Sequence, residues 1–149
     1  MIFRQILHPA TGCASYIFGC TGKKALAVVD PHLKHVDDYL AVAAEAQSPI
    51  VAIVETHVQA DHHSGALVLA ERTGAPIYLH EAADVAFAHR SLHDGEEITL
   101  GNDYLRVVHT PDIALIVFAC LQATGCVGKI PGSYSQAIPS LWGMLDAPI

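Results

Sequence analysis

Residues 55 to 65 read Glu-Thr-His-Val-Gln-Ala-Asp-His-His-Ser-Gly and hold several metal-capable side chains in one short stretch. Imidazole and carboxylate ligands suit zinc, iron, nickel and manganese. His57, Asp61 and His62 have a spacing that lets them converge on one point where a strand turns into a loop. Gln59 is a neutral amide and cannot replace an imidazole nitrogen, so a site that needs this position is damaged. The stretch predicts a metal site, or what remains of one.

A further candidate ligand is His109, because the Thr110-Pro111 turn after it is rigid and can aim a side chain inward. His63 is expected at the surface. The remaining histidines lie outside any ligand spacing, and we expect them at the surface or as satisfied core residues: His8, His32, His35, His80, His89 and His93. With ten histidines in the chain, a chance match to ligand spacing stays open.

The cluster is expected where a buried strand ends and a helix begins. Residues 25–30 and 50–55 read as buried strands with a helix over 31–47 between them, and a second helix over 64–73 ends at Gly74. Strand, helix, strand is a right-handed crossover unit, and ligands gather at the carboxyl ends of such strands. The other expected elements are strands at 2–8, 14–20, 77–80 and 113–121, a short helix at 82–88, and a hairpin of 98–100 with 105–109.

Composition limits the classes of function. The 149 residues are 52% hydrophobic and 15% charged, with a mean hydropathy of +0.35 and a formal net charge of −7. The acidic balance disfavours nucleic acid as a partner, and the longest apolar runs are too short for a membrane span. We therefore expect a cytoplasmic protein with reduced cysteines and a small-molecule partner. The domain is expected to cover residues 1–121, followed by a divergent apolar tail at 122–149.

The stretch from Thr56 to His62 resembles the Thr-His-x-His-x-Asp-His signature of the metallo-β-lactamase superfamily. The segments "GCASYIFGC", "AVVDPH", "RTGAPIYLHEAADV" and "LHDGEEITLGNDYLRVVHTP" are similar to the branch that holds glyoxalase II-like thioesterases and persulfide dioxygenases. The similarity runs from Met1 to about Pro111. It implies an α/β fold, the αββα sandwich with one or two metal ions at its edge, with an altered and truncated C-terminal part that leaves the sandwich incomplete in one chain.

The resemblance also implies a ligand set. His57 and His109 would bind a first metal, and Asp61 with His62 a second. In the persulfide dioxygenase-like branch a single Fe(II) is held by the histidines at 57 and 109 and a later aspartate, so Gln59 harms a dinuclear hydrolase more than a mononuclear oxygenase. Where the family has Thr-Gly-Asp, the nearest match ends at Cys126, whose thiolate would favour zinc. The alternative is that Cys126 is a small buried residue.

The function expected from this resemblance is that of a metal-dependent enzyme acting on a small thiol-derived substrate, by thioester hydrolysis or glutathione persulfide oxidation. It would use Zn or Fe, one ion rather than two, with Asp61 orienting or activating water. The alternative is a non-catalytic metal-binding remnant or a homo-oligomeric assembly module. An incomplete sandwich would expose a sheet face, which a homodimer could cover. A redox role for Cys120 or Cys126 is a third possibility.

Overall fold

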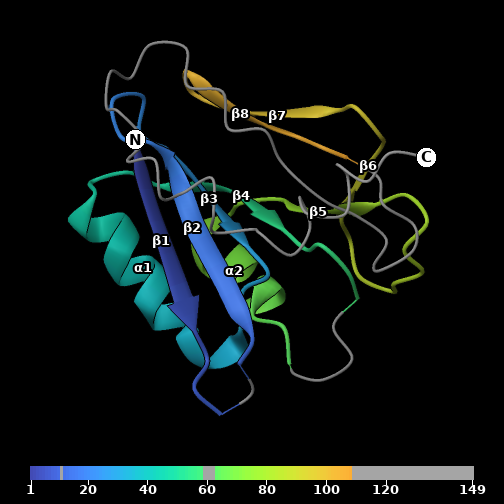
Figure 1. Cartoon of the computed structure of the whole chain (residues 1–149). Helices are drawn as coiled ribbons and strands as arrows, with labels where there is room; N and C mark the ends of the chain where they lie inside the picture. The colour runs from blue at the N-terminus through green and yellow to red at the C-terminus, as the bar shows by residue number, and fades with distance from the viewer. Residues whose placement is uncertain (11, 59–62, 109–149) are drawn as a thin grey trace, which may run out of the picture.

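The computed structural model describes residues 1–10, 12–58 and 63–108. Six strands form one mixed sheet in the order β1-β2-β3-β4-β5-β6, and two more form a separate hairpin (Figure 1). The strands are β1 (Ile2–Leu7), β2 (Ala14–Cys20), β3 (Ala25–Val29), β4 (Ile50–Val54), β5 (Ile77–His80), β6 (Arg90–Leu92), β7 (Glu97–Leu100) and β8 (Asp103–Arg106). The helices are the 3₁₀ turn η1 (Leu33–His35), α1 (Val36–Glu45) and α2 (Ala66–Thr73).

Strand β3 is the centre of the sheet, and all five of its residues are buried. It pairs antiparallel with β2 and parallel with β4. Strands β4, β5 and β6 continue in parallel. A strand that is buried on both faces is continuously apolar, which is why "ALAVV" and "IVAIV" lack polar alternation.

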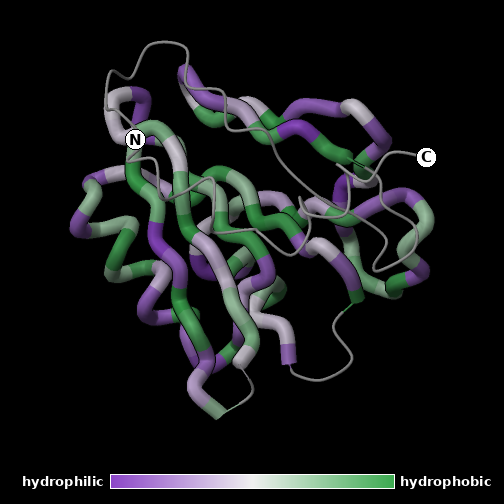
Figure 2. Tube along the Cα trace, viewed as in Figure 1, coloured by the Kyte–Doolittle hydropathy of each residue, from purple (hydrophilic) through white to green (hydrophobic). Residues whose placement is uncertain are grey.

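The two faces of the sheet are covered by different elements. On one face, α1 and α2 pack Tyr39 and Leu69 against strand residues such as Leu26 and Ile53. On the other, the β7–β8 hairpin packs its apolar residues against a second cluster that includes Val29 and Val54 (Figure 1). Figure 2 shows the apolar residues concentrated along the inner strands and polar residues along the outer turns. The layers are therefore the helices, the six-stranded sheet and the two-stranded hairpin. This is an α/β fold, as expected.

The structure differs from the sequence predictions in three places. Residues 82–88 are not helical but form a turn, a bend and irregular chain, and β6 follows them where no strand was expected. The predicted helix over 31–47 is a 3₁₀ turn followed by a shorter α-helix, because His32 is extended (φ −85°, ψ 136°) and caps η1 by accepting from Lys34 N.

None of the described helices is long and apolar enough to cross a membrane. The strand expected at 113–121 and the tail at 122–149 lie outside the described residues.

Gly19 in β2 offers a test of this packing. Its φ is +150°, and a Cβ there would clash with the carbonyl oxygen of Ala25 and lie 2.9 Å from Leu26 Cα. Gly19→Ala should therefore lower the free energy of unfolding by about 2–4 kcal/mol, because backbone strain and overpacking add. Urea denaturation followed by circular dichroism measures this change.

Gly95→Ala is the matched control. Gly95 also has positive φ (+77°), but a Cβ added there would meet nothing within 4 Å, so only the backbone penalty of about 1 kcal/mol applies. Equal costs for the two substitutions would contradict the close approach of β2 and β3.

Candidate metal centre

Asp30 and the start of the motif follow neighbouring strands at one edge of the sheet. Strands β3 and β4 are parallel, with Val29 opposite Val54. The amide of Asp30 donates to the carbonyl oxygen of Val54 at 2.9 Å. The residues after each strand therefore lie side by side, and the predicted position of the motif at a strand end is confirmed.

The Asp30 carboxylate binds Thr56, and Thr56 in turn contacts His57. Thr56 N donates to Asp30 Oδ1 at 2.7 Å, and Thr56 Oγ1 donates to Asp30 Oδ2 at 2.7 Å. Because the hydroxyl proton is used there, Oγ1 accepts from His57 Nδ1 at 2.6 Å. This assignment places the proton of the imidazole on Nδ1 and leaves the lone pair on Nε2. Metal-binding histidines commonly donate their other ring N–H in this way.

Ser64 fixes the far end of the same loop. Its hydroxyl donates to the carboxylate of Glu55, which is buried, and accepts from Ala66 N at 2.9 Å in the first turn of α2. The loop between β4 and α2 is therefore tied back to the residue at which it leaves β4. Glu55 is acidic and buried because it serves this connection.

Backbone hydrogen bonds join the end of the loop to the segment after β3. Gly65 N donates to Pro31 O at 2.6 Å, and Leu33 N donates to His63 O at 3.0 Å. A Cβ on Gly65 would lie 3.0 Å from the carbonyl oxygen of His32, so the close approach favours glycine there. Both ends of the motif loop are thus held by residues 30–33.

Of the five predicted metal ligands, the structure describes His57 alone. Asp61 and His62 lie in the segment 59–62, and His109 and Cys126 lie in 109–149, all outside the described residues. The ligand set therefore stays a prediction, as does the role of Asp61 in catalysis. The described residues place His57 just after the end of β4, with its Nδ1 beside the Thr56 hydroxyl.

A pocket of about 150 Å³ lies beside His57. Apolar side chains make up most of its described lining, and Glu55 and Ser64 add polar groups: the lining comprises Glu55, His57, Val58, Ser64, Ala66, Leu67, Leu79, Val85 and Phe87. An apolar wall next to a few convergent polar groups is the usual form of a small-molecule site. Val85 and Phe87 belong to the segment that was predicted to be helical. Both side chains line the pocket.

Three other histidines meet at the same edge of the sheet, which their spacing in the sequence did not indicate. His8 follows β1, His32 follows β3, and His35 precedes α1. One potential ligand nitrogen from each lies within 4.8 Å of the other two. The rings of His8 and His32 stack at a centroid distance of 4.1 Å. These residues were expected as separate surface or core histidines; instead His8 and His32 are buried and share one cluster with the half-buried His35.

The histidine-bearing loop lies at the carboxyl edge of a mixed sheet, which is where α/β folds commonly bind ligands. The family model of the metallo-β-lactamase superfamily matches residues 8–122. The chain belongs to this superfamily, whose members bind metal ions and act on small molecules.

Individual relatives agree with this assignment. A "probable metallo-hydrolase" of Burkholderia pseudomallei (strain 1710b) is 31% identical over 141 residues, covering 74% of this chain and 48% of that protein. The crystal structure of ETHE1 from Myxococcus xanthus superposes with a TM-score of 0.74 and 28% identity, over 81% of this chain and 54% of the other. A metallo-β-lactamase from Staphylococcus aureus gives a TM-score of 0.76 and 28% identity, over 86% and 39%. The chain spans about half the length of these relatives.

The contact between Thr56 and His57 can be tested through the imidazole tautomer. Thr56→Val removes the hydroxyl that accepts from Nδ1, so the proton of neutral His57 should move toward Nε2. Long-range ¹H–¹⁵N correlation spectra at a pH above the imidazole pKa report this directly, with His57→Ala identifying the resonance.

Thr56→Ser is the control, because it keeps the hydroxyl and should keep the Nδ1–H tautomer. A His57 tautomer that is the same in the valine, serine and unsubstituted proteins would show that Thr56 does not set it.

Proposed function

We propose that this protein is a metal-dependent enzyme acting on a small thiol-derived substrate, by thioester hydrolysis or glutathione persulfide oxidation. The observation that carries the proposal is the hydrogen-bonded series from Asp30 through Thr56 to His57, which presents His57 Nε2 at the carboxyl edge of the sheet. The resemblance of the motif and its flanks to the glyoxalase II-like and persulfide dioxygenase-like branch supports the substrate class.

The donor chemistry of the motif fits one Zn or Fe ion. We propose that His57 and His109 hold it, with the further donors drawn from Asp61, His62 and Cys126. When bound, such an ion supplies a Lewis acid that polarises a thioester carbonyl and lowers the pKa of water, or, as Fe(II), a centre for dioxygen chemistry. Asp61 would orient or activate the water. Because Gln59 supplies no imidazole, one ion is proposed rather than two.

The groups of this chain that surround the ion have separate tasks. Thr56 holds the orientation and tautomer of His57, and the Asp30 carboxylate holds the Thr56 hydroxyl that accepts from this imidazole. The pocket beside His57 offers apolar contact to the acyl or alkyl part of a substrate, since Leu67, Leu79 and Phe87 line it. Its described lining contains no lysine or arginine.

Metal content and turnover together test the proposal. The untagged protein should contain about one more iron or zinc per chain than His57→Ala, measured by plasma mass spectrometry. Zinc-loaded protein should release thiol from S-lactoylglutathione, or iron-loaded protein should consume dioxygen with glutathione persulfide. His57→Ala should lose whichever activity is present, because one imidazole ligand is removed.

His93→Ala is the matched control, because His93 is exposed and pairs with Glu81 far from the motif in sequence. It should retain both metal and activity. Turnover no faster than that of free metal, in either assay, would overturn the enzymatic proposal. A bound ion without turnover would favour the non-catalytic metal-binding alternative, and light scattering would then test for a homo-oligomeric assembly.

A further inference from the structure

We propose that His8, His32 and His35 form a second metal site, separate from the His57 motif, which binds Zn(II) through three imidazole nitrogens. Each of these histidines has a ring nitrogen that lies within 4.8 Å of a ring nitrogen of the other two. A tetrahedral zinc ion, with Zn–N distances of about 2.0–2.1 Å, holds its nitrogens about 3.4 Å apart. Closing the triad around an ion therefore requires the ring nitrogens to move toward one another.

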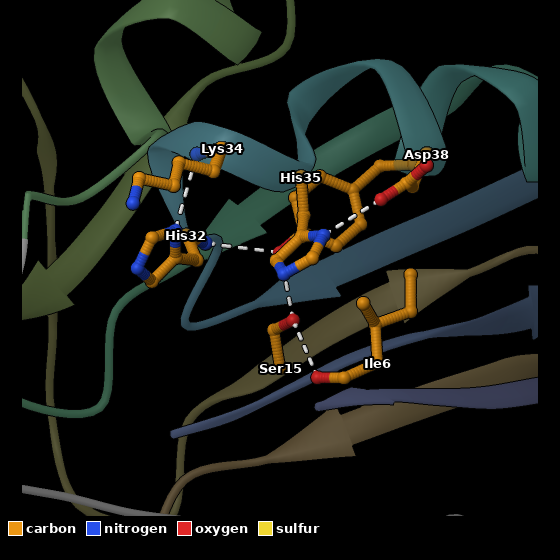
Figure 3. A network of polar contacts seen from close by, with 7 residues as sticks. Ile6, Ser15, His32, Lys34, His35 and Asp38 are labelled. Carbon is orange, nitrogen blue, oxygen red and sulfur yellow. Dashed lines mark hydrogen bonds and ion pairs between the residues drawn. The ribbon is translucent and has the colours of Figure 1, made fainter. Parts of the chain in front are cut away.

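His35 already has the form that binds metal. Its Nδ1 lies 2.7 Å from Oδ2 of Asp38, and in the neutral ring this contact assigns the proton to Nδ1 and the lone pair to Nε2 (Figure 3). His35 Nε2 is buried and has no hydrogen-bond partner among the described residues. An unpartnered buried nitrogen is costly in the absence of a ligand. The carboxylate, imidazole and open lone pair form the arrangement that commonly supports zinc.

In His8 and His32, Nδ1 lies beside a local backbone amide. Ala10 N lies 3.3 Å from His8 Nδ1, and Lys34 N lies 3.1 Å from His32 Nδ1. The contact to His8 is long for a hydrogen bond, whereas the contact to His32 has an ordinary length. The rings stack on each other and each makes an edge contact with His35. Neutral imidazole is the form that binds metal.

A buried hydrogen-bonded series holds the backbones that carry the three histidines. His32 N donates to Tyr39 Oη at 2.9 Å, Tyr39 Oη donates to Ser15 Oγ at 2.7 Å, and Ser15 Oγ donates to the carbonyl oxygen of Ile6 at 3.1 Å (Figure 3). Burial raises the pKa of Tyr39, so its phenol keeps the proton that this series needs. The series connects β1, β2, the segment after β3, and α1. The site is therefore preorganised by the fold.

The chemistry and exposure of the cluster favour Zn(II). Neutral imidazole is a preferred zinc ligand, and three protein ligands leave a fourth position for water. His8 and His32 are each 6% exposed, whereas 18% of the His35 side chain is accessible, which gives an ion a route in. Among the described residues of the motif, His57 is not a member of this group.

Zinc titration of the full chain carrying His57→Ala tests the second site without the motif. This protein should still bind about one Zn(II) per chain in competition with a chelating dye, and Co(II) should give the visible absorption of a nitrogen-coordinated ion. Zinc should raise the melting temperature, because the ion binds the folded state. Adding His35→Gln should abolish the tight binding, whereas adding His93→Gln should leave it unchanged.

Asp38→Asn keeps the test independent of folding, because the Asp38 side chain is 59% exposed. It should weaken zinc binding by about 10- to 100-fold through the loss of the carboxylate partner of His35. The proposal fails if the His57→Ala protein binds no zinc. It also fails if adding His35→Gln and adding Asp38→Asn both leave the zinc affinity of that protein unchanged. If the His57→Ala protein binds zinc but the unsubstituted protein is inactive, the proposed function is overturned and the second site is not. The two failures are therefore distinguishable.

Discussion

The two hydrogen bonds from Thr56 to the Asp30 carboxylate are the constraint on which the rest of the site depends. They join the ends of two parallel strands at the point where each chain leaves the sheet. Asp30 adopts a positive φ of 48° to reach this position, a conformation that aspartate tolerates better than most residues. A charged acceptor strengthens both bonds. The carboxylate thereby sets the start of the motif loop, the ring orientation of His57 and the course of the segment after β3.

The strand directions explain why two groups of histidines share one edge. Strand β1 is antiparallel to β2, and β2 is antiparallel to β3, so β1 runs in the same direction as β3 and β4. The residues that follow these three strands must then emerge at the same edge of the sheet. His8 follows β1, His32 follows β3 and His57 follows β4. Backbone bonds between residues 31–33 and 63–65 bring the second and third of these segments into contact.

Sequence patterns predicted the elements well where local forces decide them. Apolar runs identified β3 and β4, and Gly74, which adopts the left-handed conformation, marked the end of α2. The histidine cluster depends instead on which strands become neighbours, and no spacing along the chain encodes that. The segment 82–88 was mistaken for a helix because alanines dominate it. Its chain is directed by Ala83 N bonding to His80 O in a turn and by the burial of Val85 and Phe87 against the pocket.

The tautomers of the histidines distinguish what each one contributes to its site. His57 and His35 both direct Nδ1 at an oxygen, the Thr56 hydroxyl and the Asp38 carboxylate, so that Nε2 keeps its lone pair. His8 and His32 direct Nδ1 at backbone amides, so that their proton resides on Nε2. A metal ion must compete with a hydrogen bond at the second pair but not at the first. In each proposed site, therefore, an oxygen partner orients one imidazole for coordination. That histidine would be the first to coordinate an ion.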